Sequence, residues 1–352
     1  MPETCPTAAT PLVLGIETSC DETGAAIVRG FEVLGEALAS SVEDHARFGG
    51  VIPEIASRAH VEALEPVLGA ALDRSGVALA DIDAVAVTAG PGLMGSLTVG
   101  LAAAKALALA LDKPLLGINH VIAHALADQV VHGPLPGRAM GLVVSGGHTS
   151  LLLIEGATVR EVGATLDDAA GEAFDKIGRL LGLPYPGGPH IDRLARDGNP
   201  AAYRFPRGLM RRQDRERHPF DFSFSGLKTA VARWIEAHAD DDVPLPVADL
   251  AASFSEAVSE VLVAKTLAAC QAFEVETVVV GGGFSANSQL RDKMLHTGSH
   301  HGLTVRIPPI ALCTDNGTMI AAAGAHALRH GLPPSGLDIG ADSSLPMDRL
   351  VV

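Results

Sequence analysis

Two histidines one helical turn apart could bind one metal ion together. His120 and His124 lie in the stretch NHVIAH at residues 119–124, and positions i and i+4 share one face of a helix. Asn119 is a favourable N-cap, which would place His120 in the first turn of that helix. A metalloprotease needs H-E-x-x-H with the glutamate as general base, and Val121 occupies that position. The pattern therefore excludes that protease mechanism and leaves a metal site open.

A third metal ligand has to come from another part of the chain. Asp315 lies in CTDNG at residues 313–317, at a predicted junction between a strand and a helix. Two imidazoles and one carboxylate leave coordination positions open for substrate, as in iron or catalytic zinc sites. The alternative role for Asp315 is a helix N-cap, because aspartate is common there.

Two glycine-rich turns could bind a phosphate. SGGHT at residues 145–149 and GGGFSAN at 281–287 both follow apolar strands, and the second leads into a helix. Glycine lets backbone N–H groups approach an anion, and a helix N-terminus favours negative charge. A tight turn without a ligand is the better interpretation of either loop alone, whereas the two together favour a nucleotide.

A third glycine-rich loop does not support a dinucleotide-binding site. GPGLMG at residues 90–95 matches G-x-G-x-x-G, and Asp112 follows at about the distance of a ribose-binding acid. Asp112, however, falls at the end of the predicted helix, before the strand that should present that acid. Pro91 also removes one backbone donor from the loop. We therefore reject a Rossmann fold.

The segment GEAFDKI at residues 171–177 predicts an amphipathic helix. Phe174, Ile177 and Leu181 form its apolar stripe. Asp175 and Lys176 lie at the edge of that stripe, where they could bind sugar hydroxyls or pair with each other.

The chain has one clearly basic region, which precedes DFSFSGLK at residues 221–228. Phosphate contact would give it salt-sensitive binding, and a solvated loop is the alternative. Its six arginines are Arg204, Arg207, Arg211, Arg212, Arg215 and Arg217.

The elements that must position these residues form a repeated pattern. Two hairpins with polar tips are predicted, and each is followed by strands alternating with helices, which indicates an α/β fold with two similar mixed sheets. The segment 132–139 is a predicted hinge between the halves, and an irregular region begins at Pro184. The predicted hairpin strands are 12–16 with 25–28 and 141–144 with 150–154, and the predicted later strands are 83–88 and 277–280.

Composition narrows the class of protein. A chain of 352 residues predicts two domains, and the 47% hydrophobic content supports a sizeable core. The net charge of −15 excludes a generally basic nucleic-acid coat. The N-terminus lacks the features of a signal peptide, and the apolar stretch 97–111 is too short to span a bilayer. We expect a cytoplasmic protein without a membrane contact.

Eight motifs together resemble the TsaD family (also YgjD or Gcp), the tRNA adenosine threonylcarbamoyltransferases. They occur in the family's order from about residue 12 to 325, which makes the set far more specific than any single motif. The matching stretches are GIETSCDETGAAIV, GPGLMGSLTVG, NHVIAH, LVVSGGHTSL, GEAFDKIGRLLGLPYPGGP, DFSFSGLKTA, GGGFSAN and CTDNGTMIA.

The resemblance implies a fold and a division of the chain. The fold is the two-lobed actin/sugar-kinase/Hsp70-like (ASKHA) fold, with duplicated mixed sheets, flanking helices and a nucleotide cleft. We expect an N-terminal lobe over 11–132 and a C-terminal lobe over 138–330. An irregular basic insertion would occupy 184–228, and a C-terminal extension 331–352.

The resemblance also implies a reaction. A threonylcarbamoyl group passes from threonylcarbamoyl-AMP, made by a separate synthase, to the exocyclic amine of adenosine 37, just 3′ of the anticodon, in tRNAs that read codons starting with adenine. A TsaB-like paralogue and a TsaE-like P-loop ATPase are the implied partners. The alternatives are a small-molecule kinase of the same fold, which would need a catalytic aspartate but no histidine pair, and a non-catalytic scaffold that has lost the site.

By motif match, site roles follow for named residues of this sequence. His120, His124 and Asp315 take the metal positions, for one divalent ion per subunit, iron(II) ahead of zinc. Ile122 departs from the acidic residue that many bacterial members have there. The adenylate positions are Val143, Val144, Ser145, Gly146, Gly147, Asp175, Gly188 and Asn287, joined by Asp192 in some members. The residues we expect to hold tRNA phosphates are Arg204, Arg207, Arg211, Arg212 and Lys228.

Overall fold

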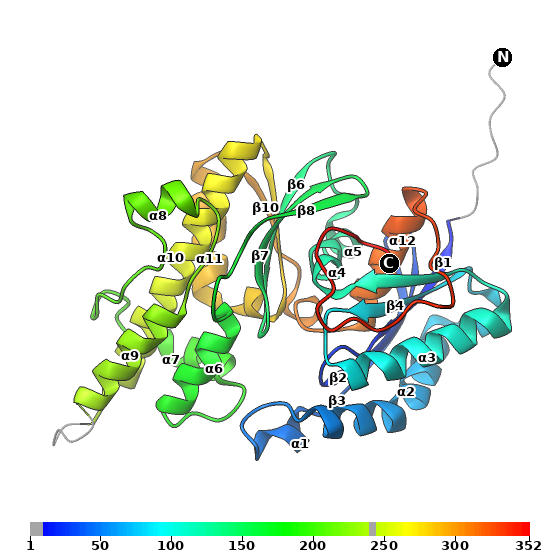
Figure 1. Ribbon diagram of the computed structural model, residues 1–352, viewed down its shortest axis with the longest axis horizontal. Helices are drawn as coiled ribbons and strands as arrows, with labels where there is room; N and C mark the ends of the chain where they lie inside the picture. The colour runs from blue at the N-terminus through cyan, green and yellow to red at the C-terminus, as the bar shows by residue number, and fades with distance from the viewer. Residues whose placement is uncertain (1–9, 239–243) are drawn as a thin grey trace.

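The computed structural model describes residues 10–238 and 244–352 as two lobes that stand side by side (Figure 1). Each lobe is built on a five-stranded mixed sheet. The N-terminal stretch, where we expect no signal peptide, falls outside the described residues up to residue 9.

The N-terminal sheet has the strand order β3-β2-β1-β4-β5. Its first three strands pair antiparallel, whereas β4 and β5 continue parallel to β1. The strands are β1 (Leu12–Glu17), β2 (Glu22–Arg29), β3 (Glu32–Ser40), β4 (Ala84–Gly90) and β5 (Leu115–Asn119). The helices are α1 (Val42–Ala46), α2 (Pro53–Ser75), the short η1 (Leu79–Asp81) and α3 (Met94–Leu111).

The C-terminal sheet repeats these pairings with the order β10-β9-β6-β7-β8. The duplication that the two predicted hairpins indicate is therefore confirmed. The strands are β6 (Ala139–Val144), β7 (Thr149–Glu155), β8 (Thr158–Ala164), β9 (Thr277–Gly281) and β10 (Thr304–Arg306). The helices are α6 (Ala170–Leu180), α7 (Gly187–Ala195), α8 (Arg212–Arg217), α9 (Ser225–Ala237), α10 (Val247–Phe273), the short η2 (Gly283–Ala286) and α11 (Ser288–His300).

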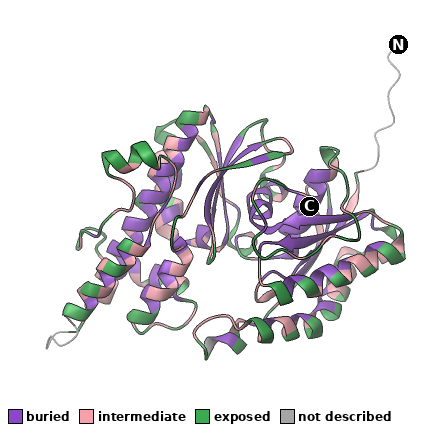
Figure 2. Ribbon diagram, viewed as in Figure 1, coloured by how far each residue is buried: buried purple, intermediate pink, exposed green. Residues whose placement is uncertain are grey.

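The remaining helices lie near the junction of the lobes, namely α4 (His120–Leu126), α5 (Gln129–His132), η3 (Ile310–Leu312) and α12 (Gly317–Arg329). One apolar cluster joins residues of both sheets to α4 and α12, including Val13, Val143 and Met319. Figure 2 shows α4, most of α12 and the sheet interiors among the most buried parts of the molecule.

Helix α12 corrects the predicted assignment of residues up to 330 to the C-terminal lobe, because it packs on the N-terminal sheet. A Cβ on Gly15 of β1 would lie 2.3 Å from the backbone nitrogen of Ala321, and a Cβ on Gly317 would lie 2.5 Å from Cα of Ala25. Such close approach of helix and sheet requires small residues on both sides. The chain therefore crosses back to the first lobe after β10.

The sequence predicts an irregular segment over 184–228. The structure instead has α7, α8 and the start of α9 within it. Helix α7 begins directly after Pro186, and its Ile191 and Ala195 are buried in the core of the C-terminal lobe. The many proline and glycine residues before α7 conceal its short apolar stripe in the sequence.

Among the described helices, α3 alone is long and apolar enough to cross a membrane by length and composition. It begins three residues before the apolar stretch predicted at 97–111. In this structure α3 covers the N-terminal sheet beside α2 (Figure 1), with Leu97, Leu101 and Ala104 buried. Its Lys105 donates to the carbonyl of Ile339 at 2.5 Å.

Candidate metal centre and adjoining cleft

The histidine pair stands at the point where β5 ends and α4 begins. Asn119 is the N-cap, as predicted, and its side-chain oxygen accepts from the backbone N–H of Val121 at 3.1 Å and of Ile122 at 3.2 Å. All seven residues of α4 are buried. The rings of His120 and His124 lie edge to face with centroids 4.8 Å apart, so they occupy the same face of α4.

Asp315 approaches this pair from the turn before α12. Asn316, not Asp315, caps that helix by accepting from the N–H of Met319 at 2.8 Å. The N-cap role considered for Asp315 is therefore wrong. Its Oδ1 lies 3.1 Å from Nε2 of His124 and 3.6 Å from Nε2 of His120. The structure thus brings the three predicted metal positions together, with one ligand atom from each within 4.8 Å of the others.

Glu17 supports the pair from the end of β1, and our sequence reasoning assigned it no role. Its side chain is fully buried, with Oε2 lying 3.2 Å from Nδ1 of His120. The same carboxylate accepts from the hydroxyl of Thr88 and the N–H of Ser19, both at 2.5 Å. Metal-bound histidines commonly donate their second ring N–H to a carboxylate in this way. An acidic residue ending a buried strand is the only sequence signal for this role.

Charge around the pair sets its protonation. Burial lowers the pKa of His120, but Asp315 and Glu17 outweigh burial and raise it to about 9. Burial raises the pKa of Asp315, but attraction to His120 and His124 lowers it below the ordinary value. His148, in the β6–β7 turn, has its pKa lowered to about 4 by burial and by repulsion from both histidines. His148 is thus neutral at pH 7.

The three groups fit a divalent transition metal. His124 is 1% exposed; within the described residues its Nδ1 has no hydrogen-bond partner, and its Nε2 meets only the carboxylate of Asp315 at 3.1 Å, without the angles of a hydrogen bond. A buried polar atom without a partner is costly, and a metal ion on Nε2 would relieve part of that cost. Two imidazoles and one carboxylate suit iron or zinc, whereas calcium and magnesium prefer oxygen ligands.

The predicted adenylate residues gather around the β6–β7 turn. Val143 and Val144 end β6 and are buried, and the turn continues through Ser145 to Gly147. The carbonyl of Ser145 accepts from the N–H of Gly171 at 3.2 Å. A Cβ on Gly282, after β9, would lie 2.4 Å from the carbonyl oxygen of Val144. The start of α6 and the loop after β9 therefore border this turn.

Asp175 lies on α6 and reaches the start of α7. Its Oδ1 accepts from the N–H of Gly187 at 2.8 Å, next to the predicted Gly188, and burial raises its pKa. The expected pairing of Asp175 with Lys176 is wrong, since the ammonium of Lys176 bonds to Asp168 at 2.9 Å. Asp175 therefore forms no ion pair within the described residues, although Arg179 of the same helix offsets part of the pKa rise, and its carboxylate reaches the start of α7.

Asp192 and Asn287 both hold the start of α11. Asp192 accepts from the N–H and hydroxyl of Ser288 at 2.7 and 2.8 Å. Asn287 is the N-cap, accepting from the N–H of Leu290 at 2.9 Å and donating to the hydroxyl of Ser255 at 3.3 Å. Their polar atoms already have partners, so both residues shape the helix end that faces the turn.

Four glycines, two in this turn and two in the α7 and β9 segments, have no structural reason to be glycine. A Cβ on Gly146, Gly147, Gly188 or Gly283 would meet nothing within 4 Å, and none of the four has a left-handed backbone. Neither packing nor conformation therefore demands glycine there. Open space beside exposed backbone is what close approach of a ligand requires.

The predicted tRNA-binding residues divide into two groups. Arg204, Arg211 and Arg212 are exposed, and Arg212 forms only a solvent-exposed pair with Glu216 at 3.4 Å. Arg207 instead pairs with Glu260 at 2.7 Å and Lys228 with Asp168 at 2.5 Å, so these two cations are partly neutralised. The exposed arginines are the ones placed to meet an anionic partner.

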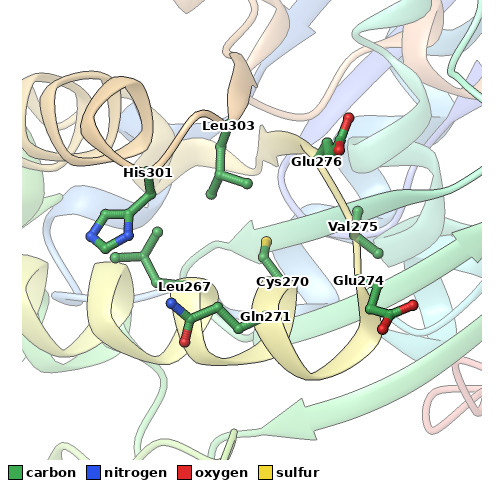
Figure 3. A pocket seen from close by; sticks show the side chains of 8 residues that line it. All are labelled: Leu267, Cys270, Gln271, Glu274, Val275, Glu276, His301 and Leu303. Carbon is green, nitrogen blue, oxygen red and sulfur yellow. The ribbon is translucent and has the colours of Figure 1, made fainter.

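A separate cavity of 210 Å³ lies at the C-terminal end of α10, between that helix, the segment that leads to β9 and the residues that follow α11 (Figure 3). It is lined by Leu267, Cys270 and Leu303, with Glu274 and His301 at its edge. No predicted site residue lines it, so it is not part of the metal centre or the cleft.

Comparison with known proteins is consistent with this geometry. The TsaD family, tRNA N6-adenosine threonylcarbamoyltransferase, matches residues 32–322. The tRNA N6-adenosine threonylcarbamoyltransferase of Bifidobacterium adolescentis is 53% identical over 97% of this chain and 99% of its own.

Solved structures support the fold alone. HypF of T. kodakarensis aligns with 92% of this chain and 48% of its own, with a TM-score of 0.61 and 14% identity. Component A of the (R)-2-hydroxyglutaryl-CoA dehydratase of Acidaminococcus fermentans aligns with 91% of this chain and 99% of its own, with a TM-score of 0.53 and 13% identity. The architecture is the two-lobed ASKHA fold.

Proposed function

Because this chain belongs to the TsaD family, we propose that it transfers a threonylcarbamoyl group from threonylcarbamoyl-AMP to the exocyclic amine of adenosine 37 in tRNAs that read codons starting with adenine. The convergence of His120, His124 and Asp315 near the glycine-rich turn supports this proposal, because His148 of that turn is close enough to both histidines for them to lower its pKa. The chain would thus act as an acyltransferase.

His120, His124 and Asp315 would hold one divalent ion, iron(II) ahead of zinc. When bound, such an ion acts as a Lewis acid on carbonyl or phosphate oxygens of the acyl donor. Glu17 fixes the ring of His120 through Nδ1 and leaves Nε2 directed toward Asp315. Both imidazoles are buried, whereas the side chain of Asp315 is 19% exposed, so the site is open on the side of the aspartate, where a substrate could reach the ion.

The adenylate would lie along the β6–β7 turn. Exposed backbone at Gly146 and Gly147 offers N–H groups to the phosphate. Asp175 and Gly188 stand at the sugar side of this arrangement, with the carboxylate already ordered by Gly187. Val143, Val144, Ser145, Asn287 and Asp192 would complete the site by shaping its floor and the end of α11.

The transfer balances without a protein nucleophile. The adenosine N6 forms a bond to the carbamoyl carbon, the bond from that carbon to the phosphate oxygen breaks, and N6 loses one proton. AMP departs as a good leaving group. Since an aryl amine is a weak nucleophile, positioning and polarisation of the carbonyl must supply most of the acceleration.

The tRNA would approach the exposed arginines around α8. We expect the double variant Arg211→Ala, Arg212→Ala to bind tRNA several-fold more weakly and with a salt dependence reduced by about two phosphate contacts. Adenylate binding should not change, because neither residue borders the β6–β7 turn. Equal loss of tRNA and adenylate binding would count against a tRNA contact here.

Partners and location complete the proposal. A separate synthase would supply the adenylate, and a TsaB-like paralogue and a TsaE-like P-loop ATPase would act with this chain in the cytoplasm. The retained histidine pair and aspartate argue against a non-catalytic scaffold. The comparisons give no support to the small-molecule kinase alternative.

Incorporation of labelled threonine into tRNA tests the function directly. The assay supplies threonylcarbamoyl-AMP, with and without the partner proteins, and uses as control a tRNA with guanosine in place of adenosine 37. We expect label in the first tRNA only. Absence of incorporation under every partner combination would contradict the proposed reaction.

A further inference from the structure

We propose that the C-terminal segment 346–352, named here the returning segment, positions the metal ligands by holding Asn119. This inference rests on the metal role proposed for His120, His124 and Asp315. It assigns a part in the metal centre to residues that lie outside both the motif set and the cleft.

The chain after α12 makes a closed loop on the free edge of β5. It first meets β5 at Ser335, whose N–H donates to the carbonyl of Leu115 at 2.8 Å and whose hydroxyl accepts from the N–H of Gly117 at 2.9 Å. It returns at Val352, whose N–H donates to the carbonyl of Gly117 at 3.0 Å. The hydroxyl of Ser335 also donates to the carbonyl of Val352, which closes the loop.

The returning segment satisfies the donors of Asn119. The backbone N–H of Asn119 donates to the carbonyl of Leu350 at 3.0 Å, and its side-chain amide donates to the carbonyl of Pro346 at 2.9 Å. Its side-chain oxygen is used for capping α4. Since Asn119 is fully buried, its side chain has one defined orientation, which the returning segment and the first turn of α4 fix together.

Apolar packing anchors the segment to the same helix. Leu350 is 2% exposed and belongs to the apolar cluster that contains Val121 and Ile122 of α4. Leu345, just before the segment, is also buried, and a Cβ on Gly90 would lie 3.0 Å from its Cβ. Figure 1 shows this part of the chain lying over the N-terminal lobe beside β4 and α4.

Helix α4 needs such support because it is short. Seven residues form only two turns, too few for a helix to be stable without tertiary contacts. The two histidines are its first and fifth residues, so any change in the cap moves both ligands. Loss of an N-cap costs about 1 kcal/mol, and mutation of residues that orient ligands typically costs about 10- to 100-fold in metal affinity.

Two variants of the full chain separate the tail contact from the cap itself. Asn119→Asp keeps an oxygen to cap α4 but removes the amide that donates to Pro346. Leu350→Ala shortens the buried anchor and leaves Asn119 intact. Leu337→Ala is the matched control, because Leu337 lies in the same extension with 47% exposure.

Zinc affinity of the metal-free protein, measured by competition with a chromogenic chelator, is the readout. The absorption spectrum of bound cobalt and the melting temperature without metal are measured on the same samples. We expect about tenfold weaker zinc binding and an altered cobalt spectrum for Asn119→Asp and Leu350→Ala, with no change for Leu337→Ala. The metal-free melting temperature of Asn119→Asp should stay within a few degrees of the wild-type value.

Wild-type zinc affinity and cobalt spectra in both variants would overturn this inference and leave the metal centre standing. Failure of the wild-type protein to bind zinc, or undiminished binding by His124→Ala, would overturn the metal centre and this inference with it. A parallel loss of metal affinity in Leu337→Ala would also overturn it, because the effect would not then depend on Asn119.

Discussion

The β1–β2 and β6–β7 hairpins hold equivalent places in the two sheets, but their connecting segments have opposite chemistry. The first connecting segment contains Asp21 and lies between Glu17, which ends β1, and Glu22, which begins β2. The second is the neutral, glycine-rich turn 145–148. The two sheets therefore share their strand pairing but differ in the residues that connect the hairpin strands. Glu17 of the first tip contacts His120 of the proposed metal centre, and the second tip presents exposed backbone at Gly146 and Gly147.

The acidic tip is unsuited to anions. Burial, together with repulsion from the neighbouring carboxylates of Asp315 and Asp21, raises the pKa of Glu22 to about 10. A phosphate placed there would meet the same repulsion. The β6–β7 turn has no acidic residue between Ser145 and Thr149, so of the two tips it is the one where a phosphate would meet no carboxylate of the turn itself.

His124→Ala should have the largest effect on this comparison. It removes one of three ligands, so we expect metal affinity to fall by at least about 100-fold and transfer activity to fall with it. Chelator competition and metal content after gel filtration measure the loss. His300→Ala, an exposed histidine of α11, is the control. Full metal content in His124→Ala would show that His124 is not a metal ligand.

A change of pH should alter metal affinity almost as much as the His124→Ala substitution does. The pKa of His120 is raised to about 9, so a proton competes with the metal at neutral pH. We expect apparent affinity to rise by up to about tenfold per unit between pH 7 and 9 and then to level off. Titration of zinc at several pH values, with the chelator calibrated at each, measures this. A flat profile would mean that His120 is not a ligand.

The same raised pKa makes a prediction for the metal-free fold. Protonated His120 stabilises the folded state through its carboxylate neighbours. This contribution is fully present below the pKa of about 6.5 that His120 has in the unfolded chain, and it is lost as the pH rises through about 9. We expect the free energy of unfolding without metal to fall between pH 7 and pH 9.5, relative to His120→Ala, as measured by urea denaturation. If the difference in free energy of unfolding between the wild type and His120→Ala did not change with pH, the ion pairs of His120 would not contribute to stability.

Glu17→Gln should weaken metal binding by about tenfold. The amide keeps the shape of the carboxylate but not the charge that holds His120. Glu22→Gln is the matched control from the same hairpin, because the raised pKa of Glu22 makes that group neutral at pH 7. The control should leave metal affinity unchanged. Equal effects of the two variants would mean that the general acidity of the tip, rather than the contact with His120, matters.

Gly147→Ala probes the other tip and should have the smallest effect. A Cβ there meets no protein atom within 4 Å, so stability should change by less than about 0.5 kcal/mol, while adenylate affinity falls several-fold. Gly282→Ala is the contrast, because its φ of 85° and the nearby carbonyl of Val144 make a Cβ strained. Calorimetric titration with AMP and thermal unfolding measure both. Unchanged AMP affinity in Gly147→Ala would show that the phosphate does not bind at this turn.

Local patterns in the sequence predict much of this arrangement. The N-cap at Asn119 and the i, i+4 spacing of His120 and His124 depend only on neighbouring residues, and both are as predicted. The two hairpins are predicted for the same reason, since each alternates apolar strands with a polar turn. Their duplication follows from comparing the two stretches.

Long-range contacts are what the sequence does not reveal. Glu17 reaches His120 only because β1 and β5 both flank β4 in the sheet. Helix α12 follows β10 in the chain, yet its small residues fit the surface of β1 in the other lobe. Roles that depend on such pairings need the fold. The residues assigned to adenylate and tRNA stay predictions until the variants above are measured.

The packing of α4 and α12 between the two sheets has a mechanical consequence. His120 and His124 are on α4 and Asp315 lies just before α12, and these two helices share one apolar cluster with residues of both sheets. One packed unit therefore carries all three side chains. Their mutual distances depend on the contact between α4 and α12 and not on either lobe alone.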